Sequence, residues 1–183
     1  MLDTISRAFF RDPVWSWVFP DEEQRGADYA EWWEFAIGAG LRNDSIQVTR
    51  SCEAVAIWIP PGLPEFTDED DARAEAFLRR ACARRADEVL DAVAQFEAWH
   101  PRAEPHWYLS VVATHPDARG GGLGVRLIEH QLAQVDALHL PAYLESSNPT
   151  NLTRYGRLGF EARDEFRMGD DGPLVTTMWR GAR

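Results

Sequence analysis

The chain has 183 residues, a length typical of one domain, and its 30 acidic residues outnumber its 19 basic ones, so the net charge is −11. Every basic residue is an arginine, because the sequence contains no lysine. The composition therefore excludes Schiff-base lysine chemistry and the lysine-containing phosphate loop of nucleotide hydrolases, and the acidity disfavours a nucleic-acid partner.

The N-terminal part of the chain is expected to hold helices and one β-hairpin. Residues 23–41 carry aromatic and aliphatic side chains at spacings that suit a largely apolar helix. Residues 46–50 and 53–59 have the pattern of two strands joined by a tight turn. The acidic run after Thr67 is typical of a helix start, and we expect helix from there to Trp99, either unbroken or with one break.

The C-terminal part alternates between strands and helices. Strands are expected at residues 107–113, 140–144, 160–168 and 174–179. Residues 123–138 have the apolar stripe of a helix. A second helix is expected to begin with Asn148 as N-cap and Pro149 as first residue and to stop at Gly159. This order of elements predicts an α/β domain with a mixed sheet.

The number of cysteines and the length of the apolar runs indicate the cellular compartment of the protein. The two cysteines form neither a disulfide framework nor a zinc site, and no cluster of side chains has the spacing of metal ligands. The longest apolar run, residues 54–61, is far too short to span a bilayer. We therefore expect a cytoplasmic protein without a metal or a membrane partner.

A glycine-rich turn is the most informative segment. Residues 119–126 (RGGGLGVR) follow a strand and open a helix, where unpaired backbone N–H groups and the helix dipole favour an anion. Glycines let a diphosphate approach this backbone closely. The dinucleotide fingerprint requires a glycine at its sixth position, where this sequence has Val125 or Leu127. The turn therefore predicts an anion cradle of another kind.

Two motifs carry a resemblance to a known family. Arg119-Gly-Gly-Gly122-Leu-Gly124 resembles the coenzyme A pyrophosphate loop, Arg/Gln-x-x-Gly-x-Gly/Ala, of the GCN5-related N-acetyltransferase (GNAT) superfamily. Downstream, residues 144–160 resemble the Asn…Tyr-x-x-Leu-Gly-Phe segment of the same superfamily. Residues 9–13, 54–58 and 100–109 are also similar to the puromycin N-acetyltransferase branch. The resemblance covers most of the chain and is stronger after residue 100.

The resemblance implies the architecture. We expect an α/β (α+β) fold with a mixed, mostly antiparallel sheet flanked by helices, and a splay between the central strands. A single acyltransferase domain would span residues 1–183, with acceptor-side helices and the hairpin in 1–105 and the coenzyme-binding and catalytic half in 106–183. The superfamily usually begins with a strand, whereas this chain starts almost directly in a helix. That first strand is missing, or the native start lies upstream of Met1.

The resemblance also implies acetyl-CoA as co-substrate and direct acetyl transfer to the amine of a small molecule. The pantetheine arm would lie along a strand edge, as in strand addition, and the turn would hold the pyrophosphate. The coenzyme-binding residues implied are Val112, Ala113, Thr114, Arg119, Gly120, Gly121, Gly122, Leu123, Gly124, Val125 and Asn151. Each arginine is equally well explained as a solvated surface charge.

Tyr155 is the candidate general acid, because the superfamily places a tyrosine there near the coenzyme sulfur and a phenol can protonate a leaving thiolate. The alternative role of Tyr155 is structural, with its ring packed under the coenzyme or in the core. An ammonium group must lose a proton before it attacks, and Glu145 at a strand end is the first candidate base. Its alternative is a solvated carboxylate. His106, His115 and Glu104 are the other candidate bases.

The acceptor pocket is expected among the N-terminal helices and the hairpin, with Phe10, Trp15, Trp32 and Trp58 as substrate-binding residues. Core packing is the alternative for each of them. Two other functions stay open, namely acetylation of a protein N-terminus or lysine, and a non-catalytic acyl-CoA-binding sensor. The chain is expected to act as a monomer or a homodimer.

Overall fold

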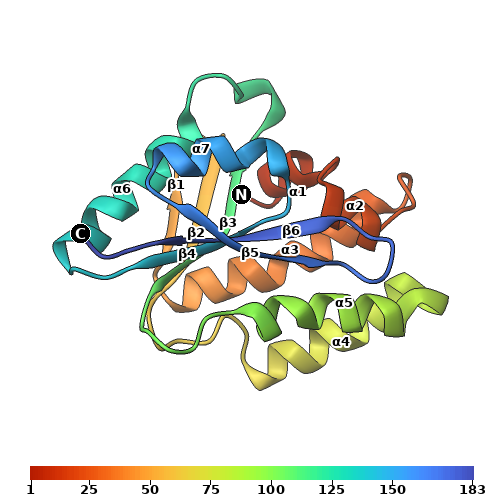
Figure 1. Cartoon of the computed structure of the whole chain (residues 1–183). Coiled ribbons are helices and arrows are strands. Elements are labelled where there is room, and N and C mark those ends of the chain that lie inside the picture. The colour runs from red at the N-terminus through yellow and green to blue at the C-terminus, as the bar shows by residue number, and fades with distance from the viewer.

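Six strands form one sheet in the order β1-β2-β3-β4-β6-β5 (Figure 1). The structure is a computed structural model that describes residues 1–183. The strands are β1 (Ile46–Val48), β2 (Ala54–Ile59), β3 (Trp107–Thr114), β4 (Ala142–Ser146), β5 (Glu161–Arg167) and β6 (Leu174–Arg180). All neighbours are antiparallel except β3 and β4, which are parallel. The expected mixed, mostly antiparallel sheet is confirmed.

The sheet is open in its middle. β3 pairs with β4 only at Trp107↔Ala142 and Tyr108↔Tyr143, so the two strands separate beyond these residues. On its other side, β3 pairs Val111 with Ile57 and Leu109 with Trp58, which leaves Ser110 as an extra residue in a β-bulge. A bulge bends its strand and re-aims side chains. The expected splay between the central strands is thus present, and it begins next to the bulge.

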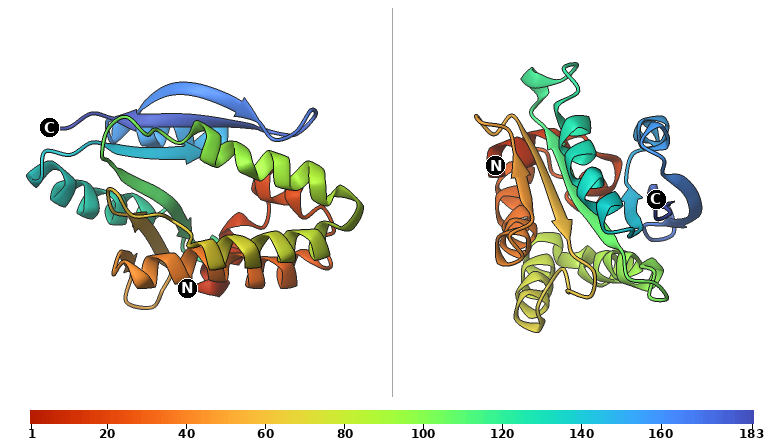
Figure 2. Two further views of the ribbon diagram at one scale, coloured as in Figure 1. Left: turned by 90° about the horizontal axis from the view of Figure 1, so that it is seen from below. Right: turned by 90° about the vertical axis from the view of Figure 1, so that its left-hand side faces the viewer.

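Helices cover both faces of the sheet (Figure 2). They are α1 (Leu2–Phe9), α2 (Pro13–Val18), α3 (Arg25–Arg42), α4 (Asp68–Cys82), α5 (Ala86–Trp99), α6 (Leu123–Ala137) and α7 (Leu152–Arg157), with short 3₁₀ turns η1 (Ala83–Arg85), η2 (Pro116–Ala118) and η3 (Pro149–Asn151). The helices before β3 pack on one face of the sheet, and α6 and α7 pack on the other. No helix combines the length and the apolar character needed to cross a membrane.

Local chemistry explains the helix ends. Thr67 and Asp70 form a reciprocal capping box at the start of α4, which satisfies two backbone donors. Ala83, with φ of 46°, breaks the predicted helix into α4 and α5. Asn148 caps the turn η3, and α7 follows it, so the predicted helix start is correct in place but begins with a 3₁₀ turn. Gly159, with φ of 92°, ends this segment as expected.

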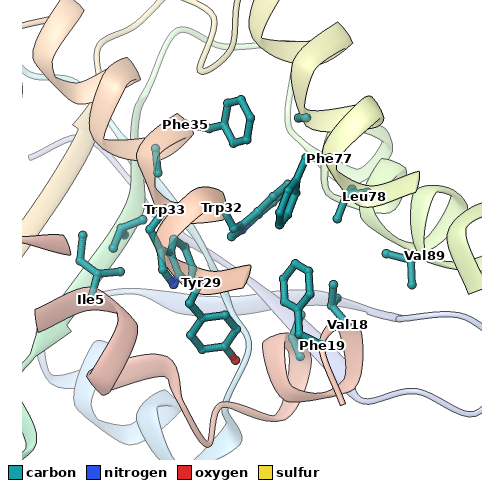
Figure 3. Close-up of a cluster of buried hydrophobic side chains, with 14 of the residues drawn as sticks. Ile5, Val18, Phe19, Tyr29, Trp32, Trp33, Phe35, Phe77, Leu78 and Val89 are labelled. Carbon is teal, nitrogen blue, oxygen red and sulfur yellow. The ribbon is translucent and has the colours of Figure 1, made fainter. Parts of the chain in front are cut away.

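Two apolar cores lie on opposite faces of the sheet. All six residues of β2 are buried, as a central strand covered on both faces requires. Val55 and Ile57 belong to the core with α1 to α5, whose aromatic cluster is drawn in Figure 3. Ala56 and Trp58 belong to the core with α6 and α7. This alternation determines which aromatic side chains of the sheet can reach the functional site.

Candidate active site

A cavity of about 1190 Å³ opens at the splay between β3 and β4. Its lining includes the glycine turn and Tyr155 from the two sequence motifs, together with residues of α1, α2, α3 and α5. The glycine turn and Tyr155, which belong to separate motifs in the chain, therefore meet around one space. The predicted acceptor-side helices face the same space.

The glycine turn has the backbone that the motif predicts. Gly120 and Gly122 have φ of 90° and 70°, a region that L side chains rarely adopt. Gly122 is the N-cap of α6, and no side chain caps this helix end. The first N–H groups of α6, from Leu123 onward, are thus left for a ligand. A Cβ on Gly124 would lie 3.0 Å from Thr114 Oγ1, so this glycine lets the helix start rest directly on β3.

Two arginines hold the turn in place through backbone carbonyls. Arg126 Nη1 donates to the carbonyl of Gly121 at 2.8 Å. Arg119 Nη2 donates to the carbonyl of Ala8 at 3.0 Å, which ties the turn to α1. Arg119 lines the cavity, whereas Gly121 does not. Both arginines are exposed, and each donates one hydrogen bond to a backbone carbonyl.

The edge of β3 that faces the splay lies beside this turn. Val112, Ala113 and Thr114 line the cavity, beyond the last residue pair that joins β3 to β4. In a strand, the backbone groups that do not face one neighbour face the other, and here β2 is the only strand partner along these residues. This edge offers N–H and C=O groups for strand-like pairing with an extended ligand. Asn151 lines the cavity too, with its Oδ1 accepting a hydrogen bond from Arg154 Nη1 at 2.6 Å.

Tyr155 points its phenol into the same cavity from α7. It is 7% exposed, and its ring packs against Phe160 with a centroid distance of 6.3 Å. Burial raises the pKa of Tyr155 to about 12, while Arg154 lowers it and Asp12 raises it. The phenol therefore keeps its proton at neutral pH, as a general acid must. Both of its interpretations, ring packing and proton donation, are compatible with this position.

Glu145 is a buried carboxylate whose oxygens accept no hydrogen bond of ordinary geometry, although the phenols of Tyr108 and Tyr143 lie close to it. Only 2% of its side chain is exposed, neither carboxylate oxygen accepts a hydrogen bond, and the residue lines the cavity. Burial, and next the negative charge of Glu145, raise the pKa values of Tyr108 and Tyr143. The alternative of a solvated strand-end carboxylate does not hold. A buried, unpaired carboxylate is unfavourable unless it gains a proton or a cation.

Two histidines next to Glu145 fix each other's tautomers. His106 Nδ1 lies 2.8 Å from the carbonyl oxygen of Glu104, which can only accept, so His106 Nδ1 carries the proton. Burial lowers the pKa of His106, which keeps it neutral, and its Nε2 therefore accepts. His100 Nε2 lies 3.1 Å from that atom and donates to it. The remaining nitrogen, His100 Nδ1, lies 3.8 Å from Glu145 Oε1 and is free to receive a proton.

A second carboxylate, Glu65, lines the cavity from the segment between β2 and α4, and no sequence motif predicts it. Its side chain accepts a hydrogen bond from Ser110 Oγ, the bulge residue of β3, and its carbonyl accepts one from Arg42 at 3.2 Å. Burial, against the lowering effect of the Ser110 hydrogen bond, raises the pKa of Glu65 to about 7, with smaller contributions from the charge of Glu145, which raises it, and from His100, which lowers it. Nothing in the local sequence marks this residue, because its partner is 45 positions away.

Aromatic side chains form one wall of the cavity. Phe10, Trp15 and Trp32 line it as predicted. We use the name aromatic wall for Trp15, Trp32, Trp33, Phe66 and Phe96. Trp15 makes close ring contacts with Trp32 and Trp33, both with centroids 5.1 Å apart, and it stacks on Phe96.

The structure does not support a substrate-binding role for Trp58. This residue has no exposed surface, and it does not line the cavity. Alternation along β2 points its ring into the core with α6 and α7, away from the aromatic wall. Of the other candidate bases, His115 receives the N–H of Asp117 at its Nδ1, and the side chain of Glu104 is exposed.

Comparison with known proteins decides the family. The sequence model of the acetyltransferase (GNAT) family matches residues 43–160. The chain belongs to the acetyltransferase (GNAT) family. The GNAT assignment from the two motifs is confirmed, and the closer likeness to the puromycin branch stays a prediction.

Solved structures agree on the fold of this acetyltransferase. A Corynebacterium glutamicum structure described as "histone acetyltransferase HPA2 and related acetyltransferase" is 27% identical with a TM-score of 0.70, over 100% of this chain and 89% of that one. Arylalkylamine N-acetyltransferase 2 from Aedes aegypti is 9% identical with a TM-score of 0.60, over 100% and 93%. Chaetomium thermophilum Naa20 with a bisubstrate analogue is 13% identical with a TM-score of 0.51, over 99% and 82%.

The residues around the cavity fit the acetyl-CoA that GNAT enzymes use. The positive-φ glycines and the uncapped start of α6 suit a diphosphate, and the free edge of β3 suits an extended amide-bearing arm. The cavity thus has two sides, a coenzyme side with the glycine turn and the free edge of β3, where the family's coenzyme fits, and an acceptor side with Glu65, Glu145 and the aromatic wall.

Proposed function

We propose that this acetyltransferase transfers the acetyl group of acetyl-CoA directly to the primary amine of a small molecule, with Tyr155 as general acid and Glu145 as general base. One observation carries the proposal: a single cavity joins the glycine turn, the phenol of Tyr155 and the unpartnered carboxylate of Glu145. Placing two reactants in one enclosed space converts an encounter into a local reaction.

The coenzyme side is proposed to bind acetyl-CoA and to orient it in the cavity. Backbone N–H groups at residues 120–125 are proposed to hold the pyrophosphate, and Val112, Ala113 and Thr114 to hold the pantetheine amides. Asn151 is proposed to contact the coenzyme beside Tyr155. When bound, acetyl-CoA supplies an activated acetyl thioester. The anchored Arg119 and Arg126 keep this turn in one conformation before ligand arrives.

Tyr155 and Glu145 are proposed to move the two protons of the reaction. An alkylamine with a pKa near 10 is protonated at neutral pH and cannot attack a carbonyl carbon. Glu145 removes that proton, either directly or through a water molecule. Tyr155 donates its phenolic proton to the departing sulfur and regains one from solvent.

A small acceptor is favoured over a polypeptide by the chemistry of the acceptor side. Its wall is aromatic, and the carboxylate of Glu145 beside it is buried. Small, mostly apolar sites with a few convergent polar groups are typical of small-molecule pockets. Protein acetylation is the second candidate, and the description of the 27% identical bacterial structure as a histone acetyltransferase favours it.

The test combines binding and turnover. Calorimetry with acetyl-CoA is expected to show saturable binding, and a thiol-release assay with a panel of primary amines is expected to show turnover. The same assay with histone-tail and N-terminal peptides tests the second candidate. Binding without turnover on any amine or peptide would indicate a non-catalytic sensor, and absence of binding would refute the whole proposal.

A further inference from the structure

Glu65 and Glu145 reach one cavity from two different elements. Glu145 extends from β4 on one side of the splay. Glu65 comes from the segment before α4 and is held by the bulge residue Ser110 of β3 on the other side. The negative charge of each carboxylate acts on the other, and the two lie beside the ring of Tyr108. They are a pair across the opening of the sheet rather than two neighbours on one strand.

No arginine neutralises this pair. The only basic side chain within ion-pair distance of Glu145 is His100, whose facing nitrogen, Nδ1, carries no proton in the tautomer described above, and Glu65 forms no ion pair. Its hydrogen bond with neutral Ser110 supplies no counter-charge. Glu97 adds a further negative charge near Glu65, and Arg42 contacts only the Glu65 backbone. A carboxylate that is 2% exposed and accepts no hydrogen bond, next to a second carboxylate, is a site prepared for a cation.

The surroundings of the pair define the rest of the ligand. Phe66 follows Glu65 in the chain, and Phe96 lies on α5; both line the cavity with Trp32. A ring on the ligand can stack on this wall while its ammonium group meets the carboxylates. The faces of Tyr108 and the wall also favour a positive charge over a neutral group. The ligand chemistry indicated is a primary ammonium joined by a short linker to an aromatic ring.

Resting on the acetyltransferase function above, we propose that Glu65 and Glu145 together form the binding site for the ammonium group of an arylalkylamine acceptor, with Glu65 as the residue that selects the cation. Glu145 accepts one N–H proton of the ammonium, and the freed nitrogen lone pair forms the new N–C bond as the C–S bond breaks. The sulfur takes the proton of Tyr155. As the amide forms, the nitrogen also loses its second N–H proton to solvent, from which Tyr155 regains one, so the proton that Glu145 passes on is the one proton released per turnover.

The two carboxylates have different roles: Glu145 removes a proton from the acceptor, and Glu65 holds the acceptor in place. Once Glu145 has taken the proton it is neutral and no longer attracts the acceptor. Glu65 keeps its charge through that step and holds the acceptor in place. The same charge discriminates against a neutral isostere, because an alcohol in that position would leave Glu65 unpaired in the cavity.

Calorimetry measures this binding without turnover. Benzylamine, 2-phenylethylamine and 3-phenylpropylamine are the probes, and 2-phenylethanol is the neutral match, each added to protein saturated with coenzyme A. Wild type is expected to bind at least one of the amines about tenfold or more tightly than the alcohol. Glu65→Gln is expected to lose that preference while binding 2-phenylethanol within twofold of wild type. Glu65→Asp, which keeps the charge, is expected to retain part of it.

Proton counting adds an independent readout. Repeating the titration at pH 7 in buffers of different ionisation enthalpy is expected to show release of about half a proton on amine binding, because Glu65 with a pKa of about 7 is half protonated there. Glu65→Gln is expected to abolish this release. The control is Glu129→Gln, an exposed carboxylate on α6, which is expected to behave as wild type.

The outcomes separate the two proposals. Equal weakening of amine and alcohol by Glu65→Gln, or no change in either, would overturn the role of Glu65. If wild type acetylates other amines and binds none of the three probes, the inference is wrong and the acetyltransferase function stands. If the protein does not bind coenzyme A or acetyl-CoA, both fail.

Discussion

Glu145 Oε1 lies 3.8 Å from His100 Nδ1, and 21% of the His100 side chain is exposed against 2% of the Glu145 side chain. The pair therefore joins a carboxylate inside the cavity to a nitrogen that water can reach. In the proposed mechanism, the proton that Glu145 takes from the acceptor must reach solvent, and His100 is the group placed to pass it on. His106, whose Nε2 accepts from His100 Nε2, keeps the receiving nitrogen turned toward Glu145.

His100→Gln is expected to lower kcat by roughly tenfold while the KM for the amine changes less than twofold, because the proton exit is lost and the ammonium site is not. Steady-state kinetics across pH 6–9 measures this. Added imidazole is expected to restore part of the rate by carrying the proton. His130→Gln, on the exposed face of α6, is the control. A parallel loss of kcat and acetyl-CoA affinity, without rescue, would indicate a structural role instead.

Tyr155→Phe removes the phenolic oxygen and keeps the ring that packs on Phe160. We expect kcat to fall by about 100-fold or more, the scale of general acid catalysis, with acetyl-CoA affinity unchanged. Single-turnover kinetics and calorimetry measure the two effects. A variant as fast as wild type would leave Tyr155 with ring packing alone.

Gly120→Ala is expected to weaken acetyl-CoA binding by roughly tenfold, because an L residue at φ of 90° costs about 1–2 kcal/mol and the turn must rearrange. Gly124→Ala is expected to act through a different cause, the contact of the new Cβ with Thr114 Oγ1. Calorimetric titration with acetyl-CoA measures both. The matched control is Gly181→Ala, where no atom lies within 4 Å of the added Cβ. Unchanged affinity in both turn variants would remove the turn from the coenzyme site.

Glu65→Gln is expected to raise the free energy of unfolding at high pH. The reason is that the charged Glu65 carboxylate of the wild type destabilises the folded state there. The pKa of Glu65 rises from 4.5 to about 7 on folding, so below pH 4.5 the residue is protonated in both states and has no effect on the pH dependence. Between pH 4.5 and about 7 the folded state keeps a proton that the unfolded state has lost, and stability falls as pH rises. Above about 7 that loss is complete.

The difference in unfolding free energy between Glu65→Gln and wild type is therefore expected to grow from near zero at pH 4.5 to at most about 3 kcal/mol at pH 8. Urea unfolding at the two pH values measures it. His100, Glu145 and Glu97 are the titrating groups that act on Glu65, so the comparison is made against Glu129→Gln at each pH. If the variant gains the same unfolding free energy over wild type at both pH values, Glu65 is not the group whose titration changes the stability.

The sequence predicts the conformation of the glycine turn well because the signals for it are local. Gly120, Gly122 and Gly124 follow one another within a single turn, and their special conformations and close contacts can be predicted from glycine spacing. The same holds for Thr67 and Asp70, whose capping box lies within four residues. Elements with strong local signals were therefore predicted close to their observed bounds.

The acceptor side depends on contacts between distant residues, and there the sequence was less informative. Glu65 gains its environment from Ser110, and Glu145 from His100, through contacts that only the folded sheet creates. Trp58 was assigned to the pocket by its aromatic character, whereas the strand's alternation sends it to the opposite face. An alternating pattern shows that a strand has two faces, but it does not tell which face meets the cavity.

The two-pair junction between β3 and β4 has a consequence for solubility. Beyond Tyr108 and Tyr143 the sheet has two inner edges, in addition to the outer edges at β1 and β5. Unpaired strand edges invite pairing with strands of other molecules. Here the inner edge of β3 lines the cavity, with α1 and the start of α6 beside it. A ligand that pairs with this edge would therefore also cover the backbone groups that could otherwise pair with a strand of another molecule.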